Sequence, residues 1–469
     1  MKVSASRPRI GLLALTLELY EQMAPELRPG RERWLREQVL PALASAAEVR
    51  FTRAVWTRDD IEQVVAEYEA AQLDALLVMH LTYSPSGHAL PALKQTRLPI
   101  LVWNTQELAG VDSNLAKHAM IENHGVHGTQ DLCSVLVREG VPFEYATSHL
   151  ADSNALAQLS DYFTAAAAVH RLRQARIGLL GYPFPGMGDL AVDMTHLAAT
   201  LGCRCQPLAL PEYHRRAASA DTGRVEALKA EYRAAYDVAN DVTETDLDAT
   251  ARAEVALRSM AEDHRLDALS YQFLCFGEDD RSVTVPFVAI SRMMSEGMGF
   301  AGEGDVVGAA GSWLLGRLQS PASFTEIFTI DFAGNGMALS HMGEANVAMA
   351  RRDRRVPLVV RPKPIVPTQA GQLALITSFE PGPATLCALT MGPGGRWRLI
   401  ASTLRIEDFG PLPGMCVPHC RVIAHRDVRD WLTAYAQLGG PHHHAVCFGD
   451  ARNKIRLAAR LINAEYHEI

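Results

Sequence analysis

Two glutamates stand in sequence settings that suit them to hold a ligand or move a proton. Glu303 lies within the glycine-bracketed segment 299–305, where the backbone can bend closely around a ligand. Asp305 ends that segment and can act as the N-cap of a helix over residues 306–318. Glu326 ends a Ser-Phe-Thr-Glu tetrapeptide that fits a capping box by residue type. The β-rich residues after it favour a strand instead, and a solvated loop carboxylate is the ordinary alternative for Glu303.

A hairpin is predicted directly after Glu326. Asn335-Gly336 fits a two-residue turn that returns the chain towards His341. In this register His341 lies opposite Ile330, on the same face as Glu326 but roughly 13 Å away along the strand. A bulge or a shifted register would bring the two side chains together, and without one they are not ligands of the same metal ion.

Three consecutive histidines, His442, His443 and His444, follow a Gly-Gly-Pro break. Imidazoles bind metal ions, but three consecutive side chains cannot point the same way, so at most one or two of them share a site. A polar loop is the alternative interpretation. Residues 416–420 add two cysteines and a histidine, yet no second pair stands at zinc-finger spacing, so we expect no structural zinc there.

Length and composition restrict the class of protein. With 469 residues, 48% of them hydrophobic and 21% charged, the chain should form about three globular domains rather than one small binding module. The net charge of −8 leaves no basic surplus, so nucleic acid is not an expected partner. No apolar run approaches the ~18 residues of a membrane helix, and residues 10–15 fit a first buried strand rather than a signal peptide. We therefore expect a cytoplasmic protein whose eight scattered cysteines are reduced.

Short motifs recur in the same order in two parts of the chain. Arg-Ile-Gly-Leu-Leu, typical of a buried strand, occurs twice, Leu-Asp-Ala-Leu follows each copy after a helical stretch, and a third apolar run then follows a proline. The pairs lie at residues 9–13 and 176–180, 73–76 and 266–269, and 99–103 and 286–290. This alternation of strands and helices predicts two successive Rossmann-like, doubly wound α/β lobes with parallel sheets.

The pattern changes after about residue 320 to short β-rich runs separated by Gly/Pro turns. The runs are 324–332, 356–360, 372–378, 384–391 and 397–403, and helices are expected over 428–437 and 453–466. This spacing predicts a mostly antiparallel, β-rich third domain, a barrel or a sandwich. We therefore expect three domains, at residues 1–170, at 171–322 with Glu303, and at 323–469 with the other candidate ligands.

Doubly wound lobes bind ligands beyond the carboxyl ends of their strands. The residues in that position are 104–106 in the first lobe and the loop 181–189, which includes Met187, in the second. That loop has three glycines but not the dinucleotide spacing, so it does not favour a nucleotide, and a turn without any ligand is the alternative.

Together these motifs resemble the L-arabinose isomerase family, within a superfamily that includes L-fucose isomerase. The motifs are, in order, residues 292–305, Ser-Phe-x-Glu326, Ser340-His341-Met342 and Gly-Gly-Pro-His442-His443. The resemblance implies a divalent ion, typically Mn²⁺, held by two glutamates and two histidines. These map onto Glu303, Glu326, His341 and His443, with His442 as the alternative to His443. Carboxylate and imidazole ligands suit Mn²⁺.

The resemblance covers the whole chain and implies an aldose–ketose isomerase that works through a cis-enediol. L-arabinose is the leading substrate, and Glu303 and Glu326 move the protons. Residues 123–128 resemble a family segment whose histidine reaches the sugar of a neighbouring subunit, which makes His127 a candidate substrate contact. The protein would then be a homo-oligomer built from trimers, up to a hexamer, with a site shared between subunits. A surface-loop histidine is the alternative.

The chain departs from the family at sugar-recognition positions. Tyr20 aligns with the tyrosine of a family Gln-x-x-Tyr, but Leu17 stands where the glutamine is expected. Ile327 and Phe328 stand where the family has Asp-Tyr. Lost hydrogen bonds change discrimination between sugars, so D-galactose, L-fucose or another pentose or hexose competes with L-arabinose. Tyr20, Met187, Phe328 and His127 are the candidate sugar contacts.

Two other functions remain open at this point. The altered recognition positions, and two lobes like those of sugar-binding proteins, are compatible with a non-catalytic sugar-binding or regulatory protein. A different metal enzyme of sugar metabolism, an epimerase or a lyase, could use the same ligands.

Overall fold

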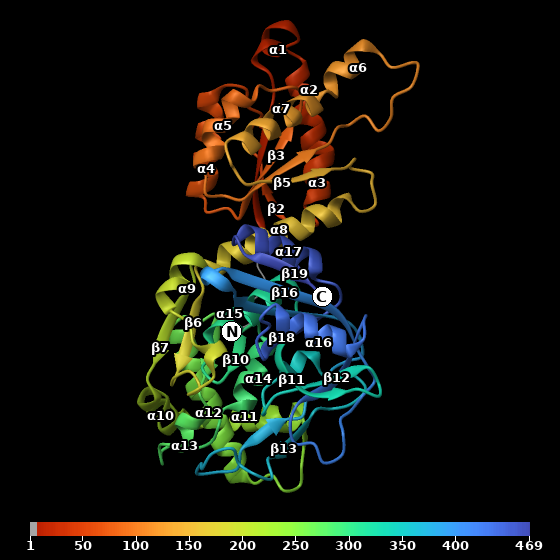
Figure 1. Ribbon diagram of the computed structural model, residues 1–469. Coiled ribbons are helices and arrows are strands. Elements are labelled where there is room, and N and C mark those ends of the chain that lie inside the picture. Colours follow the sequence, from red (N-terminus) through yellow and green to blue (C-terminus); the bar gives the residue numbers. More distant parts are fainter. Residues whose placement is uncertain (1–6) are drawn as a thin grey trace. The chain divides into compact units, whose positions relative to one another are not determined.

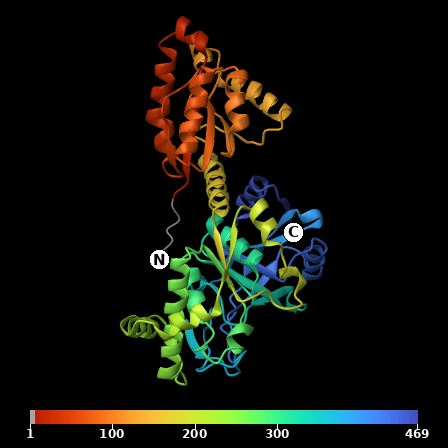
Figure 2. The same ribbon diagram turned by 90° about the vertical axis from the view of Figure 1, so that its left-hand side faces the viewer.

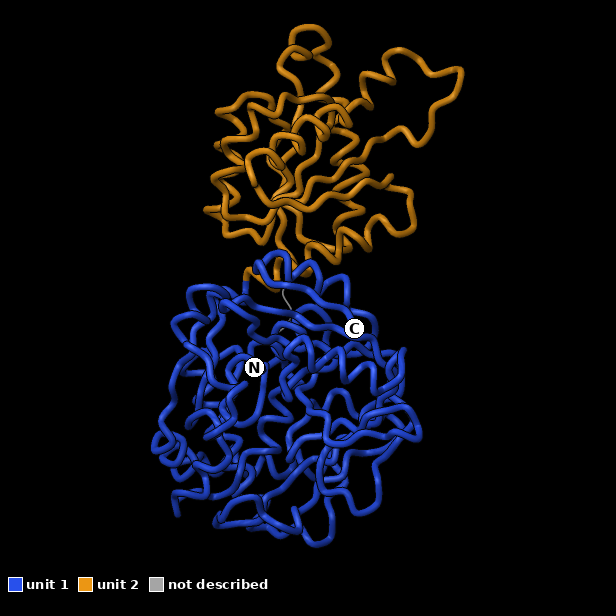
Figure 3. The backbone as a smooth tube through the Cα atoms, viewed as in Figure 1, with its two compact units in different colours: residues 1–5, 171–469 blue, residues 6–170 orange. Residues whose placement is uncertain are grey.

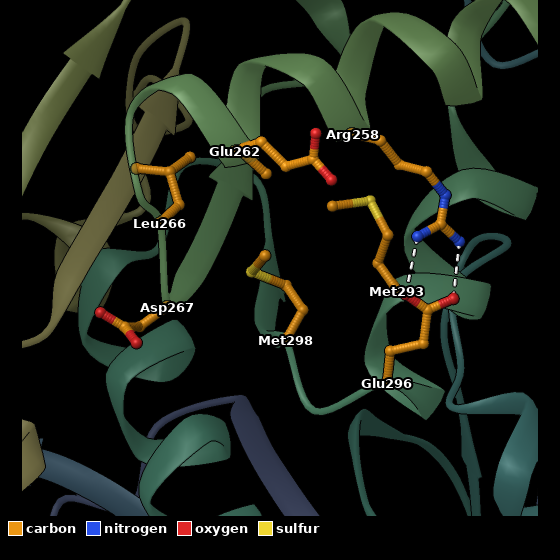
Figure 4. A pocket seen from close by; sticks show the side chains of 8 residues that line it. Arg258, Glu262, Leu266, Asp267, Met293, Glu296 and Met298 are labelled. Atoms are coloured by element: carbon orange, nitrogen blue, oxygen red, sulfur yellow. Dashed lines mark hydrogen bonds and ion pairs between the residues drawn. The ribbon is translucent and has the colours of Figure 1, made fainter. Parts of the chain in front are cut away.

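The computed structural model describes residues 7–469, which divide into two compact units (Figure 1 and Figure 3). The first unit extends to His170, and the second comprises Arg171–Ile469. Helix α8 (Ala155–Leu172) carries the chain from one to the other. Within the described residues, no helix is both long enough and apolar enough to cross a membrane.

The first unit is a parallel sheet with helices on both faces (Figure 2). Its strands, in the spatial order β2-β1-β3-β4-β5, are β1 (Arg9–Leu15), β2 (Glu48–Arg50), β3 (Ala75–His80), β4 (Ile100–Asn104) and β5 (Glu144–Thr147). Its helices are α1 (Glu18–Met23), α2 (Leu27–Trp34), α3 (Leu40–Leu43), α4 (Arg58–Ala70), α5 (Ser86–Gln95), α6 (Lys117–Glu122) and α7 (Gly125–Arg138). Strands β1 and β3 are almost wholly apolar because helices cover both of their faces.

The second unit begins with a second parallel α/β lobe. Its strands, in the order β10-β9-β6-β7, are β6 (Arg176–Leu180), β7 (Arg204–Leu208), β9 (Ala268–Tyr271) and β10 (Gly299–Gly302). Its helices are α9 (Met194–Thr200), α10 (Leu210–Ala218), α11 (Thr222–Ala235), α12 (Glu244–Asp263), α13 (Leu274–Gly277), α14 (Phe287–Ser295) and α15 (Val306–Leu318). Helix α15 packs against β10 and against strands of the third domain, so it joins the two halves of this unit.

The two lobes predicted from the repeats are confirmed. The Arg-Ile-Gly-Leu-Leu copies form β1 and β6, and the Leu-Asp-Ala-Leu copies lead into β3 and β9. The third pair does not correspond, because the run after Pro286 is helix α14 and not a strand. That helix is buried nearly all round, so its apolar run has no period that separates helix from strand.

The β-rich domain is a closed, mostly antiparallel barrel, in agreement with its prediction. Its strands follow the order β15-β18-β11-β12-β17-β16, and β15 also pairs with β16, which closes the ring. They are β11 (Ala322–Asp331), β12 (Gly336–Ser340), β15 (Gly382–Met391), β16 (Trp397–Ile406), β17 (His419–Ala424) and β18 (His443–Phe448). Helices α16 (Val428–Gln437) and α17 (Arg452–Leu461) follow, the first with the predicted bounds.

Three details of the third domain differ from expectation. The runs near 356–360 and 372–378 form β13 (Pro357–Val360) and β14 (Leu373–Leu375), but these lie in a separate sheet, in which β13 pairs with β14 and with β8 (Asp237–Val238). The last helix ends at Leu461 because Asn463 takes a left-handed conformation, with φ of 55°. The chain then ends in strand β19 (Glu465–Glu468), parallel to β16.

The hairpin after Glu326 has a different turn and register from the predicted one. Residues 332–335 form a four-residue turn in which the Asp331 carboxylate accepts a hydrogen bond from Gly334 N at 2.8 Å. Arg421 bonds both Asp331 and the Gly334 carbonyl, which fixes the longer turn. The register shifts at Phe328, a β-bulge, so that Glu326 pairs with Ser340. The longer turn alone would place His341 directly opposite Glu326, and the bulge moves it by one residue, so His341 lies next to the level of Glu326 and not far along the strand.

The first turn of α7 lies on the buried side chain of His80 at the end of β3. A Cβ added at Gly128 would lie 2.1 Å from His80 Cδ2. Gly128→Ala is therefore expected to lower the free energy of unfolding by about 1–3 kcal/mol, as overpacking does. Gly87→Ala in α5, with no atom within 4 Å, is the control and should change stability by less than ~1 kcal/mol. Urea unfolding followed by circular dichroism compares them, and equal stabilities would contradict this packing.

Candidate active site

Four side chains of the second unit converge at one point. Glu303, Glu326, His442 and His443 each offer one nitrogen or oxygen atom, and these atoms all lie within 4.8 Å of one another. Glu303 directly follows β10 of the α/β lobe, Glu326 lies in β11 of the barrel, and the two histidines lie at the start of β18. The group is therefore built where the lobe meets the barrel.

Strand pairing brings Glu326 and His443 together. The two residues are direct cross-strand partners between β11 and β18. His443 Nε2 lies 2.9 Å from Glu326 Oε1, although the pair lacks the geometry of a hydrogen bond, and the His443 side chain is fully buried. The barrel register thus fixes one carboxylate and one imidazole side by side.

Glu303 is held in an unusual backbone conformation. Its φ is 63°, in the left-handed region that a residue with a side chain rarely adopts, and Gly304 follows with φ of 79°. Its carbonyl accepts a hydrogen bond from Phe184 N at 2.9 Å, and a Cβ at Gly304 would lie 2.4 Å from the Tyr182 carbonyl oxygen. The loop after β6 therefore holds Glu303 in place, and such strain is typical of functional positions.

His341 lies beside this group. Its Nε2 atom is 4.0 Å from Glu326 Oε1, and its ring is 6.1 Å from that of His443, with the Phe324 ring at 4.6 Å from the first and 4.8 Å from the second. The ring edge touches Gly302, where a Cβ would lie 2.8 Å from His341 Cε1. His341, the fifth candidate ligand, therefore contacts Gly302, the residue directly before Glu303.

A carboxylate stands behind each of the three histidines. Nδ1 of His443 lies 2.9 Å from Asp305, Nδ1 of His341 lies 2.6 Å from Glu344, and Nδ1 of His442 lies 2.6 Å from Asp189. Each contact turns Nε2 of its ring towards the glutamates, an arrangement common around metal-binding histidines.

Asp305 has two roles in this arrangement. Its second oxygen caps α15 by accepting from Gly308 N at 2.8 Å, as the sequence predicted. Glu344 and Asp189 were not among the residues predicted from the sequence. Glu344 could have been found from its spacing, three residues after His341, whereas nothing in the sequence links Asp189 to His442, which is 253 residues away.

Electrostatics favour positive charge between the glutamates. Burial opposes ionisation of Glu303, but the imidazoles of His442 and His443 outweigh it and lower its pKa to about 2. Burial likewise raises the pKa of Glu326, but the imidazoles of His443 and His341 outweigh it and bring that pKa below its usual value. Burial lowers the pKa of His443, but Asp305, Glu303 and Glu326 together raise it well above its usual value. The carboxylates are therefore ionised at neutral pH and stabilise a cation.

The donor atoms fit a divalent cation. Glu303 Oε2, His341 Nε2 and His443 Nε2 are buried and have no hydrogen-bond partner. In residues 7–469, the cationic partners of Glu303 and Glu326 within 4.0 Å are histidines only, with no lysine or arginine. Buried polar atoms without partners call for an unseen ion or water, and carboxylate oxygens with imidazole nitrogens suit Mn²⁺ and similar ions.

Two candidate sugar contacts lie in the second unit. Met187 is half-buried in the same loop as Phe184 and Asp189, the loop that contacts Glu303 and His442. Phe328, the bulged residue of β11, is 46% exposed. It lines a pocket of about 570 Å³ that also includes Ile330, Phe332, Tyr435 and His442.

The other two candidate sugar contacts lie in the first unit. The Tyr20 hydroxyl forms a hydrogen bond with His124 Nε2 at 2.9 Å, and the His124 and His127 rings are 5.6 Å apart. His127 itself is exposed. Buried hydroxyls without partners on Thr16, Ser84 and Thr105 follow β1, β3 and β4 at the carboxyl edge of the sheet. Contact of Tyr20 and His127 with a sugar stays a prediction.

The remaining candidates are His444, His419 and the cysteines. His444 is buried, and burial lowers its pKa to about 3. The two ring nitrogens of His419 meet the Val417 carbonyl and Leu412 N. All eight cysteines are free thiols.

The chain matches known sequence domains along most of its length. The L-arabinose isomerase N-terminal domain matches residues 33–174, the central domain 175–315 and the C-terminal domain 321–465. The chain is 27% identical to L-arabinose isomerase of Acidothermus cellulolyticus, over 85% of this chain and 81% of that one. It is 26% identical to L-arabinose isomerase of Herpetosiphon aurantiacus, over 90% of this chain and 85% of that one. The chain therefore belongs to the L-arabinose isomerase family, a family of aldose–ketose isomerases.

Proposed function

We propose that this protein is a metal-dependent aldose–ketose isomerase that converts L-arabinose, or a related pentose or hexose, to the ketose. The observation that carries the proposal is the convergence of Glu303, Glu326 and His443 on one point, with buried donor atoms that lack partners. Family membership supports the same reaction class.

Glu303, Glu326, His341 and His443 would hold the ion, for which Mn²⁺ is our proposal. His442 is the alternative to His443, but its ring is partly exposed, whereas His443 is buried and its Nε2 has no hydrogen-bond partner. When bound, the ion supplies a Lewis acid that polarises the sugar carbonyl and the adjacent hydroxyl.

The two glutamates carry the proton transfers. An aldose becomes a ketose when the proton on C2 moves to C1 and the proton on O2 moves to O1, with a cis-enediol between the two steps. One glutamate takes the C2 proton and returns it to C1, and the other moves the oxygen-bound proton. The lowered pKa values of both keep them ionised at neutral pH, which is the form that a general base requires.

Sugar recognition would involve Met187, Phe328, Tyr20 and His127. Phe328 offers an apolar ring beside His442 but no phenol oxygen, which favours a substrate whose hydroxyl pattern needs no partner there. Because residues 123–128 resemble a family segment whose histidine reaches the sugar of a neighbouring subunit, we propose a homo-oligomer in the cytoplasm, trimer-based and up to a hexamer, in which His127 contacts the sugar in a site shared between subunits.

Removing either carboxylate should abolish most of the activity. Glu303→Gln and Glu326→Gln are each expected to lower kcat at least ~100-fold, because an amide cannot accept the proton. The measurement is ketose formation with Mn²⁺ from L-arabinose, D-galactose and L-fucose. Glu62→Gln, at an exposed glutamate paired with Arg58, is the control and should keep full activity.

The identity of the product separates the alternatives. A ketose of unchanged mass supports the isomerase. An epimeric aldose would indicate an epimerase, and cleavage products would indicate a lyase. Sugar binding without any product would indicate a non-catalytic protein.

Gly302 should matter for metal binding although it offers no ligand. Gly302→Ala places a methyl group 2.8 Å from His341 Cε1 and 3.0 Å from Nε2, so we expect the ring to move and the Mn²⁺ dissociation constant to rise about tenfold or more. Gly316→Ala in α15, with its nearest atom at 3.9 Å, is the matched control. Mn²⁺ titration followed by electron paramagnetic resonance measures both, and unchanged affinity in Gly302→Ala would remove His341 from the ligand set.

A further inference from the structure

Behind His341 lies a buried carboxylate that no lysine or arginine neutralises. We propose that Glu344, held in turn by Tyr271, is a positioning residue that fixes the His341 ring with Nε2 towards Glu326 and makes that nitrogen a stronger metal ligand. The proposal rests on the metal site of the proposed function and adds two residues to it.

The three side chains form a continuous hydrogen-bonded chain. Glu344 Oε2 lies 2.6 Å from His341 Nδ1, and the Tyr271 hydroxyl donates to the other oxygen, Oε1. All three residues are 2% exposed or less. Because an ionised carboxylate only accepts, the contact keeps the hydrogen on Nδ1 and leaves the lone pair on Nε2. That nitrogen is buried and has no hydrogen-bond partner.

A second buried Tyr–Glu pair in the same unit provides the contrast. Glu254 is 0% exposed and accepts from Tyr232 at 2.7 Å, as Glu344 does from Tyr271. Glu254, however, also meets Arg258 at 2.8 Å and Arg292 at 3.0 Å. Within the described residues, the only cationic partner of Glu344 within 4.0 Å is His341.

The contrast between Glu254 and Glu344 indicates the role of the Glu344 charge. A buried charge is costly unless an opposite charge compensates it, and Glu254 has two guanidinium groups for that purpose. Among the described residues, the charge of Glu344 is compensated through the imidazole of His341, by a proton on the ring or by a cation bound at Nε2. Nε2 is on the side on which Glu303 and Glu326 gather.

Tyr271 and Glu344, which form a hydrogen-bonded relay to His341, are both held in place by their neighbours. Tyr271 is the last residue of β9, and its ring packs against Phe300 at 5.1 Å and Phe276 at 5.7 Å between centroids. Glu344 follows Gly343, where a Cβ would lie 2.6 Å from the Phe287 ring. The relay therefore joins the parallel sheet of the lobe to the end of β12 in the barrel.

The test measures metal affinity and stability separately, in the full-length protein. Glu344→Gln keeps the size of the side chain and removes its charge, and should raise the Mn²⁺ dissociation constant about 10- to 100-fold. Tyr271→Phe keeps the packing, removes the hydroxyl bond to Glu344 and should raise the constant by a smaller factor. Electron paramagnetic resonance titration with Mn²⁺ gives the constants. Thermal unfolding in EDTA should give a Tm for Glu344→Gln that is equal to or above that of the wild type.

Two control variants separate this role from ordinary packing. Glu254→Gln should lower Tm in EDTA, because it removes the buried charge shared by Arg258 and Arg292 and leaves them only Glu296 and Glu231, and it should leave Mn²⁺ affinity unchanged. Tyr213→Phe removes a buried hydroxyl that has no hydrogen-bond partner and should change neither quantity.

The outcomes are distinguishable. Wild-type Mn²⁺ affinity in both Glu344→Gln and Tyr271→Phe would overturn the inference and leave the metal site standing. A lowered Tm in EDTA with unchanged affinity would also overturn it, because Glu344 would then serve only the fold. If Glu344→Gln does not fold, Tyr271→Phe decides. A wild-type protein that binds no Mn²⁺ would overturn the metal site itself.

Discussion

The cross-strand pairing of Glu326 with His443 is the interaction on which the rest of the candidate site depends. Strand β11 lies between β12 and β18, so its register sets the position of Glu326 relative to both. The four-residue turn at 332–335 places Ile330 opposite Met337, and so brings the end of β12, and with it His341, to the level of Glu326. The bulge at Phe328 then shifts the register by one residue, so that Glu326 pairs with Ser340 and not with His341. The turn and the bulge together therefore set the positions of candidate ligands from three strands.

Glu303 has to come from outside the barrel, and the fold holds it there by local strain. A left-handed backbone at Glu303 is maintained by the Phe184 hydrogen bond and by a tight contact of Gly304 with Tyr182. Immediately afterwards Asp305 caps α15 and also holds His443. The helix that joins lobe and barrel thus starts at the site and fixes a candidate ligand from each of them.

Features that depend on local sequence could be predicted, and features that depend on distant side chains could not. The Asp305 cap and helices α15 and α16 follow from capping residues and periodicity within a few positions. The turn at 332–335 escaped prediction because Arg421, 90 residues away, stabilises it through Asp331. The sheet formed by β8, β13 and β14 joins segments of two predicted domains. The residue types of the candidate ligands were evident in the sequence. The carboxylates behind the histidines were not, and Asp189 is the clearest case.

The candidate ligands come from both halves of the second unit, and this affects how the protein unfolds. An ion held by Glu303 on one side and by Glu326 and His443 on the other would link the lobe to the barrel. The first unit contains none of these ligands. Metal would therefore raise the unfolding temperature of the second unit and leave that of the first unit unchanged, so the two units would respond differently to a chelator.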